Sequence, residues 1–127
     1  MKQLGPAIVG PSGKVLPLSA GVEVGGFIYL SGQLAMNDGK ILDGGITAQT
    51  EQVFDNIEAL LATAGATLAD VFKATVWLTA ASDFADFNAV YASRFKAPYP
   101  VRSTVICALV APEALVEIEV VATKPGS

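Results

Sequence analysis

The sequence predicts an α/β (α+β) fold in which one mixed sheet carries two helices on a single face. Alternating apolar and polar residues predict strands toward both ends of the chain, and two stretches with helical periodicity lie between them. The resulting order is strands, helix, strand, helix, strands, which is typical of a sheet covered by one layer of helices. With 127 residues, the chain is expected to form a single domain, residues 1–127.

The first forty residues are rich in turn signals. Residues 1–17 read as irregular or edge structure, and Pro11-Ser12-Gly13 is compatible with a small hairpin between residues 7–9 and 15–16. Residues 21–24 and 27–31 are predicted strands. Gly25-Gly26 between them suits a tight turn with positive φ. A further turn at residues 37–39 precedes a short strand at residues 40–42.

The first helix is predicted over residues 47–64. Its apolar residues fall at helical spacing on one face: Val53, Ile57, Leu60, Leu61 and Ala64. Gly65 follows the last of them, as expected for a helix C-terminus.

A strand is predicted over residues 71–79, and a second helix over residues 83–95. Ser82 is the expected N-cap of that helix. Alternation should divide the side chains of the strand between its two sides, with Phe72, Ala74, Val76 and Leu78 on one and Lys73, Thr75 and Trp77 on the other. The helix should bury the stripe Phe84, Phe87, Val90 and Tyr91. Two final strands are predicted over residues 101–109 and 115–122.

Composition and charge argue against several classes of function. The formal net charge is −4 and the eight Lys and Arg residues are dispersed, so we expect no nucleic-acid partner and no anionic membrane partner. No apolar run is long enough to span a membrane. The single cysteine, Cys107, fits a cytoplasmic protein without an internal disulfide. Histidine is absent, which removes His-based nucleophile pairs and argues against a metal site.

Hydrophobic residues make up 52% of this short chain. Because both helices are expected on one face of the sheet, the other face would remain uncovered. Small monomers seldom expose large apolar patches. We therefore expect the chain to form oligomers through the bare face of the sheet.

Arg102 is the most informative residue in the sequence. It is one of only two arginines and lies among Val101, Val105 and Ile106, where a guanidinium is costly to desolvate. Its partner is either a protein carboxylate, Glu117 or Glu119, or a planar anion held by the guanidinium fork. From the residues alone these two interpretations are evenly balanced.

Glu117 lies in the alternating stretch 116–120, which should bring carboxylates close to Arg102. In one interpretation, Arg102 binds the carboxylate of a substrate and Glu117 holds a water molecule beside it. The simpler interpretation is that Glu117 and Glu119 form the solvated face of a half-buried strand. The residues alone favour the simpler one.

Several motifs together resemble the RidA/YjgF family. They are Ser31-Gly32-Gln33, residues 52–57 and 64–71, Asp83-Phe84 with Asn88 and Tyr91, residues 100–103 and residues 116–119. The similarity extends over residues 21–123. It implies a chorismate-mutase-like fold and a homotrimer with ligand clefts at its subunit interfaces. It also implies cofactor-free hydrolysis of reactive enamines and imines, such as 2-aminoacrylate, to 2-keto acids and ammonia.

The resemblance assigns roles to individual residues. Arg102 would bind the carboxylate of the imine or keto acid, and Glu117 would position or activate water. Backbone groups near Gly32 and Thr104 would frame the ligand, and Ser31 and Asn88 would line the cleft. The alternative for Ser31 is a hydroxyl bonded to nearby backbone, and for Asn88 an ordinary helix-surface amide.

Two positions depart from the family pattern. Leu18 occupies a substrate-binding position where many members carry tyrosine, and Thr104 stands where many carry cysteine. Leu18 favours a cleft that accepts apolar side chains. It also keeps two alternatives open: a non-catalytic trimer that binds small carboxylates or acts like a chaperone, and a deaminase dedicated to one pathway and another substrate.

Overall fold

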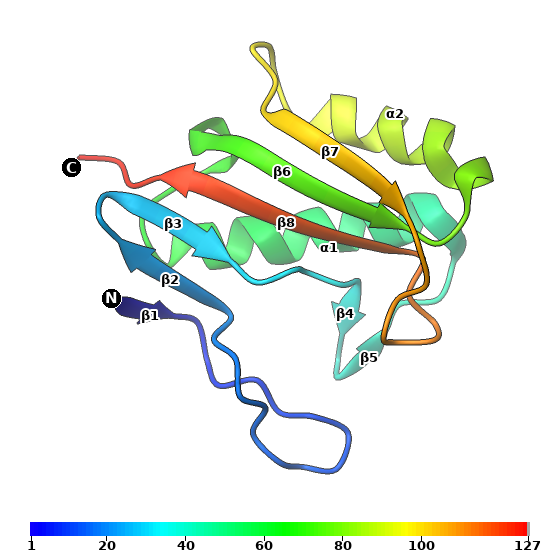
Figure 1. Ribbon diagram of the computed structural model, residues 1–127, viewed down its shortest axis with the longest axis horizontal. Coiled ribbons are helices and arrows are strands. Elements are labelled where there is room, and N and C mark those ends of the chain that lie inside the picture. Colours follow the sequence, from blue (N-terminus) through cyan, green and yellow to red (C-terminus); the bar gives the residue numbers. More distant parts are fainter. Residues whose placement is uncertain (127) are drawn as a thin grey trace.

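The computed structural model describes residues 1–126, and Ser127, the last residue of the expected domain, lies outside them. Its main sheet has six strands in the order β1-β2-β3-β8-β6-β7, with α1 and α2 packed behind it (Figure 1). The elements are β1 (Lys2–Leu4), β2 (Gly21–Val24), β3 (Phe27–Leu30), β4 (Met36–Asn37), β5 (Lys40–Ile41), α1 (Gly45–Ala62), η1 (Leu68–Asp70), β6 (Val71–Leu78), η2 (Ala81–Asp83), α2 (Phe84–Arg94), β7 (Val101–Ile106) and β8 (Val116–Thr123).

The sheet is mixed, as predicted. Neighbouring strands pair antiparallel except β6 and β7, which are parallel and are connected through α2. A parallel connection needs such a crossover, because the chain must return to the end of the sheet at which the first of the two strands began. Strand β7 therefore lies at the edge of the sheet beside α2 (Figure 1).

The core lies between the helices and one face of the sheet. Val53, Ile57 and Leu61 of α1 are fully buried, and so are Val76 of β6 and Ile118 of β8. The apolar periodicity of the first helix and the alternation of the late strands therefore predicted the core correctly. The conformation of Gly65, with φ of 74°, also agrees with the expected helix end.

Several boundaries differ from the predictions. Helix α1 begins and ends two residues earlier than expected, and β7 ends at Ile106 instead of at residue 109. Strand β1, within the stretch expected to be irregular or edge structure, pairs with β2. Residues 7–16 form only a single bridge, between Val9 and Val15. Ser82 lies inside η2 and does not cap α2, because the chain turns helical one step before the expected cap.

Two aromatic residues depart from the predicted patterns and are exposed. The pairing of β6 with β8 shifts register between Val71 and Lys73, so Val71 is buried and Phe72 is 41% exposed. A bulge of this kind reverses the alternation of side chains at one point. Phe84, at the first turn of α2, is 40% exposed, while the rest of its predicted stripe is buried.

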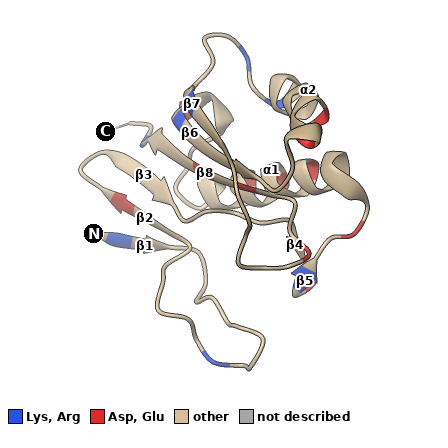
Figure 2. Ribbon diagram, turned by 45° about the vertical axis from the view of Figure 1, so that its right-hand side comes forward, with Lys and Arg blue, Asp and Glu red and all other residues tan. Residues whose placement is uncertain are grey.

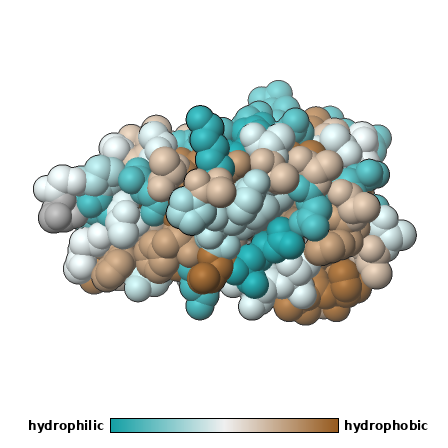
Figure 3. Space-filling model, turned by 90° about the horizontal axis from the view of Figure 1, so that it is seen from above, coloured by the Kyte–Doolittle hydropathy of each residue, from teal (hydrophilic) through white to brown (hydrophobic). Residues whose placement is uncertain are grey.

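The face of the sheet opposite the helices is apolar and uncovered. Phe27, Tyr29 and Phe72 form a group of edge-to-face rings there. Val101 and Val105 of β7 are also exposed. Figure 3 shows apolar surface in several patches along one edge of the molecule, separated by polar side chains. Apolar surface of this kind is typical of a surface that another protein chain covers.

Charged residues are scattered over separate elements (Figure 2). Arg94 lies in the last turn of α2. Its guanidinium forms ion pairs of 2.8–2.9 Å with Glu51, Asp55 and Glu58 of α1. Arg94 thus ties α2 to α1. Within residues 1–126, no helix combines the length and the apolar character needed to cross a membrane.

Candidate active site

The strand pairing decides which face of the sheet Arg102 uses. In the parallel register of β6 and β7, Arg102 lies beside Ala74, and Thr104 lies beside Val76. Ala74 and Val76 are buried beneath the helices. Because paired residues share a face, Arg102 and Thr104 lie on the helix side of the sheet.

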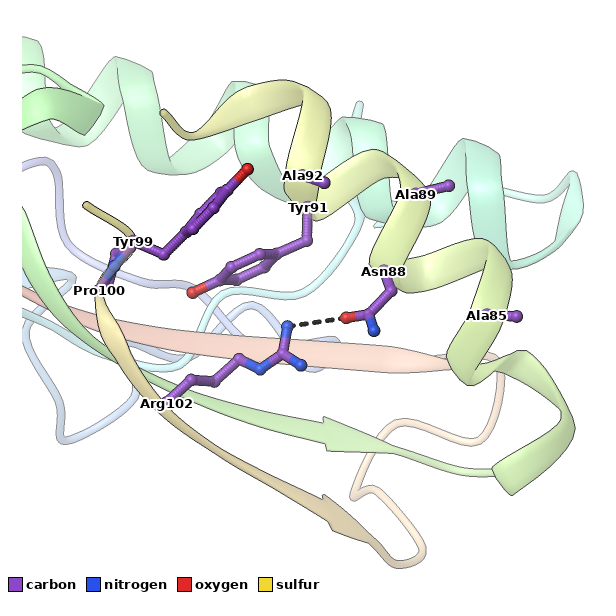
Figure 4. A pocket seen from close by; sticks show the side chains of 8 residues that line it. All are labelled: Ala85, Asn88, Ala89, Tyr91, Ala92, Tyr99, Pro100 and Arg102. Atoms are coloured by element: carbon purple, nitrogen blue, oxygen red, sulfur yellow. Dashed lines mark hydrogen bonds between the residues drawn. The ribbon is translucent and has the colours of Figure 1, made fainter. Parts of the chain in front are cut away.

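Aromatic rings of α2 surround the Arg102 guanidinium. Its central carbon lies 4.6 Å from the ring centre of Tyr91, 5.6 Å from that of Phe87 and 5.8 Å from that of Phe84. Its Nη1 donates a 2.8 Å hydrogen bond to Oδ1 of Asn88, so Asn88 is more than a helix-surface amide (Figure 4). Among residues 1–126, Arg102 makes no ion pair. The expected alternative of a salt bridge to Glu117 or Glu119 is therefore not what this structure contains.

An open groove of about 600 Å³ runs past the guanidinium, between α2 and the connector that leads into β7. Figure 4 shows Arg102 and Asn88 on its floor, with the alanines of α2 along one side. Asn88 accepts from one of the two N–H groups of Nη1. The Nε–Nη2 edge of a guanidinium has the geometry that binds a carboxylate at two points. The lining residues are Ala85, Asn88, Ala89, Tyr91, Ala92, Tyr99, Pro100 and Arg102.

Glu117 belongs to a second group of residues. It pairs with Trp77 in the register of β6 and β8, between Val116 and Ile118, which are fully buried beneath the helices. Glu117 therefore points to the open face. There its carboxylate lies against Gly32, where an added Cβ would collide with Oε2. The bridge between Gln33 and Ile118 fixes this approach, with backbone hydrogen bonds of 2.8 and 3.0 Å.

Ser31 connects this group to the N-terminal loop. Its hydroxyl donates a 2.6 Å hydrogen bond to the carbonyl of Ser19, and its backbone N–H donates to the carbonyl of Ala20 at 2.9 Å. The hydroxyl therefore has a structural partner, which agrees with the simpler interpretation of Ser31. Leu18, which precedes Ser19 in the N-terminal loop, is 46% exposed.

The electrostatic environment of Glu117 is unusual for a strand carboxylate. Burial raises its pKa, and the nearby charge of Glu119 raises the pKa further. Both effects disfavour the ionised form. A carboxyl group with a raised pKa is suited to exchanging protons near neutral pH.

One chain does not bring the two groups together. Arg102, Thr104 and Asn88 lie on the helix side, and Glu117 with Gly32 lies on the open side, with β6 between their strands. The sequence-based expectation that strand alternation brings the Glu117 carboxylate close to Arg102 thus does not hold within a single copy. The reason is that β7 pairs with β6 and has no direct contact in the sheet with β8.

From the sequence, the rings that surround Arg102 were expected only to form the buried stripe of the second helix. The signal was nonetheless present, because Phe84, Phe87, Asn88 and Tyr91 recur at spacings of three and four residues and share one face of a helix. What the sequence lacks is the position of β7 against that face. Among residues 1–126, no group of three or more His, Cys, Asp or Glu side chains could hold a metal ion.

Gly32→Ala is expected to lower activity strongly with little loss of stability. The new methyl group would displace the Glu117 carboxylate, which sits at the end of a flexible side chain and can move at small cost. For the water-positioning role that the family resemblance gives Glu117, such a displacement is expected to cost about 100-fold in rate. Activity and thermal unfolding measured on the same preparation would check this. Gly39→Ala serves as a control with open space around the new methyl group but a positive φ. Equal activity of Gly32→Ala and wild type would contradict the expectation.

Comparison with known proteins gives a consistent result. The model of the family described as "Endoribonuclease L-PSP" matches residues 13–124. A "RutC family protein" from Pyrococcus abyssi is 40% identical over 110 residues, which are 85% of this chain and 87% of that protein. A "2-iminobutanoate/2-iminopropanoate deaminase" from Dermatophagoides farinae is 38% identical over 105 residues, covering 81% of this chain and 82% of that protein. The crystal structure of RidA from an Antarctic Psychrobacter matches with a TM-score of 0.85 and 37% identity, over 97% of this chain and 99% of that one.

Proposed function

This chain belongs to the endoribonuclease L-PSP family, also called RidA/YjgF, and on that premise we propose that it is a cofactor-free enamine and imine deaminase. Its substrates would be reactive 2-aminoacrylate or 2-imino acid intermediates, and its products 2-keto acids and ammonia. The observation that carries the proposal is the Arg102 guanidinium beside an open groove, with no carboxylate of residues 1–126 as a partner. The relative from Dermatophagoides farinae, which is named 2-iminobutanoate/2-iminopropanoate deaminase, supports the same substrate class.

We place the complete site between two copies of the chain. Arg102 and Glu117 lie on opposite faces of one sheet, so a ligand touching both requires Glu117 from a neighbouring subunit. The uncovered apolar face around Phe27, Tyr29 and Phe72 supports such an assembly. A homotrimer, the assembly implied by the family resemblance, would form three equivalent sites. In each, Ser31, Gly32 and Leu18 would line the same side as Glu117, and Asn88 and Thr104 the side of Arg102.

The proposed reaction needs few catalytic groups. Arg102 holds the carboxylate of the imine and so fixes the position of the imino carbon. Glu117 takes a proton from water as the water oxygen bonds to the carbon of the protonated imine, and the C=N π electrons move to nitrogen, which becomes a neutral amine. Glu117 then gives that proton to the amine, and the C–N bond breaks with its electron pair leaving on ammonia. The hydroxyl proton passes to Glu117 as the keto C=O forms, and from Glu117 to the departing ammonia, which leaves as ammonium. Orientation and one proton-transfer group suffice for such a labile bond.

A coupled assay tests the proposal directly. A pyridoxal-phosphate dehydratase supplied with serine or threonine releases the unstable enamine, and keto acid formation is followed with and without this protein. Acceleration of keto acid release supports the function. Stabilisation of the protein by 2-oxobutanoate without any acceleration would instead identify a non-catalytic carboxylate-binding protein. Acceleration restricted to other amino acid precursors would assign a more specialised substrate.

Mixing two inactive variants tests the placement of the site. Arg102→Ala and Glu117→Gln are each expected to be inactive, but random co-assembly joins an intact Arg102 from one chain with an intact Glu117 from the other. Closed rotational symmetry then restores roughly a quarter of the sites. Co-refolded mixtures should recover activity in that proportion. No recovery in verified mixed oligomers would show that both residues act within one chain or not at all.

A further inference from the structure

The two arginines of this chain both lie near aromatic rings, Arg94 at 5.7 Å from the ring centre of Phe54, but they differ in their charged partners. Arg94 is ion-paired to three carboxylates, which occupy Nε, Nη1 and Nη2. Arg102 is held by aromatic rings and a single amide oxygen. Rings attract a cation through their quadrupole without neutralising it and without taking up its N–H donors. The second arrangement therefore fixes a guanidinium while keeping it available for an anion.

Tyr91 contributes most to this arrangement. Its ring centre lies nearer to the Arg102 guanidinium than that of any other ring in residues 1–126, at 4.6 Å. The ring is itself immobilised by neighbours, with Phe54 at 5.8 Å, Phe87 at 5.6 Å and Phe95 at 4.8 Å between centres. Figure 4 shows it extending from α2 across the groove toward the chain at Pro100 and Arg102. A rigid ring is a fixed surface against which a flexible arginine can be oriented.

We propose that Tyr91 is a positioning residue for the ligand-binding arginine, whose ring face sets the orientation of the Arg102 guanidinium for an incoming carboxylate. This inference rests on the proposed function, because it gives Arg102 a ligand. It assigns the role to the ring and not to the hydroxyl. Burial raises the pKa of the Tyr91 hydroxyl, and the nearby charge of Arg102 lowers it in part, so the hydroxyl lies near Arg102. It is nevertheless buried without a hydrogen-bond partner of good geometry within residues 1–126.

Three variants separate the ring from the hydroxyl and from general packing. Tyr91→Phe keeps the ring, and Tyr91→Leu removes it. Phe95→Leu is the matched control, because Phe95 is buried in the same aromatic cluster and packs on Tyr91 but makes no contact with Arg102. Tyr91→Leu should raise KM for the imine, and Kd for 2-oxobutanoate, about tenfold, with a smaller change in kcat. Tyr91→Phe and Phe95→Leu should bind as the wild type does, because Phe54 and Phe87 still hold the ring at residue 91 in place. Phe95→Leu should nevertheless unfold at a lower temperature.

Nuclear magnetic resonance gives a readout that does not depend on activity. With two arginines in the chain, the spectrum contains two Nε–Hε signals, which Arg94→Lys assigns. The Arg102 signal should carry a ring-current shift in wild type and Tyr91→Phe and lose it in Tyr91→Leu. Loss of the shift or of affinity in Tyr91→Phe would overturn the inference by giving the role to the hydroxyl. An unchanged shift and unchanged affinity in Tyr91→Leu would overturn it altogether. A protein that shows the shift but neither binds 2-oxobutanoate nor hydrolyses imines would refute the proposed function instead.

Discussion

Arg102→Ala is expected to lower kcat/KM for 2-imino acids about 100- to 1,000-fold, because charge-assisted two-point contacts to a carboxylate contribute several kcal/mol. Arg102→Lys should recover only part of this loss. Lysine restores the charge but not the planar fork that Nε and Nη2 present beside Asn88. The coupled deamination assay and the affinity for 2-oxobutanoate measure both variants.

The second arginine provides the control for this experiment. Arg94→Ala removes the ion pairs between α1 and α2 and should lower thermal stability. It should leave KM unchanged, since Arg94 is occupied by carboxylates of its own chain. If Arg102→Ala keeps wild-type activity, or Arg94→Ala shows the same rise in KM, Arg102 does not bind the substrate.

Glu117→Gln is expected to lower kcat about 100- to 10,000-fold with little change in KM, the range typical of a lost proton-transfer group. The wild-type rate should also fall at low pH. Because burial, and then the charge of Glu119, raise the pKa of Glu117, this decline should begin at a higher pH than for an ordinary glutamate. A kcat/KM profile between pH 4 and pH 9 would show it. A variant with the wild-type kcat would remove Glu117 from the mechanism.

The same substitution should raise stability at neutral pH. A pKa that is higher in the folded state than in the unfolded state means that the folded state binds the proton more tightly. The unfavourable contribution of ionised Glu117 is therefore fully present above its folded pKa, and it fades as the pH falls toward the unfolded value. The unfolding temperature of Glu117→Gln should be higher than that of wild type at neutral pH, and the two temperatures should converge in acid.

Much of the fold followed from periodicity, and its exceptions have local causes. The helical stripe of Val53, Ile57 and Leu61 and the alternation around Ile118 identified the core faces correctly. The register shift beside Phe72 left no mark in the sequence, because a bulge depends on how two strands meet. Such features come from pairing between distant segments, which one-dimensional patterns do not contain.

The same holds for the candidate site, where the important residues could be predicted from the sequence but their positions relative to one another could not. Arg102 and Glu117 were singled out by residue type and strand context, but their opposite faces follow from the register in which β7 and β8 each pair with β6. The partners of Arg94 could have been anticipated, since Glu51, Asp55 and Glu58 follow one another at helical spacing on α1. Their acidic stripe was visible, and only the packing of α2 on α1 decides which cation it meets.

The aromatic cluster gives the binding cation an unusual dependence on the interior of the protein. Phe54 of α1 contacts both Tyr91 and Phe95, so the ring nearest the guanidinium is part of the packing between the two helices. A change that displaces the Tyr91 ring frees the arginine as well, whereas a change that leaves this ring in place lowers stability alone. Ligand affinity should thus weaken whenever the ring moves, even while the backbone is still fully folded.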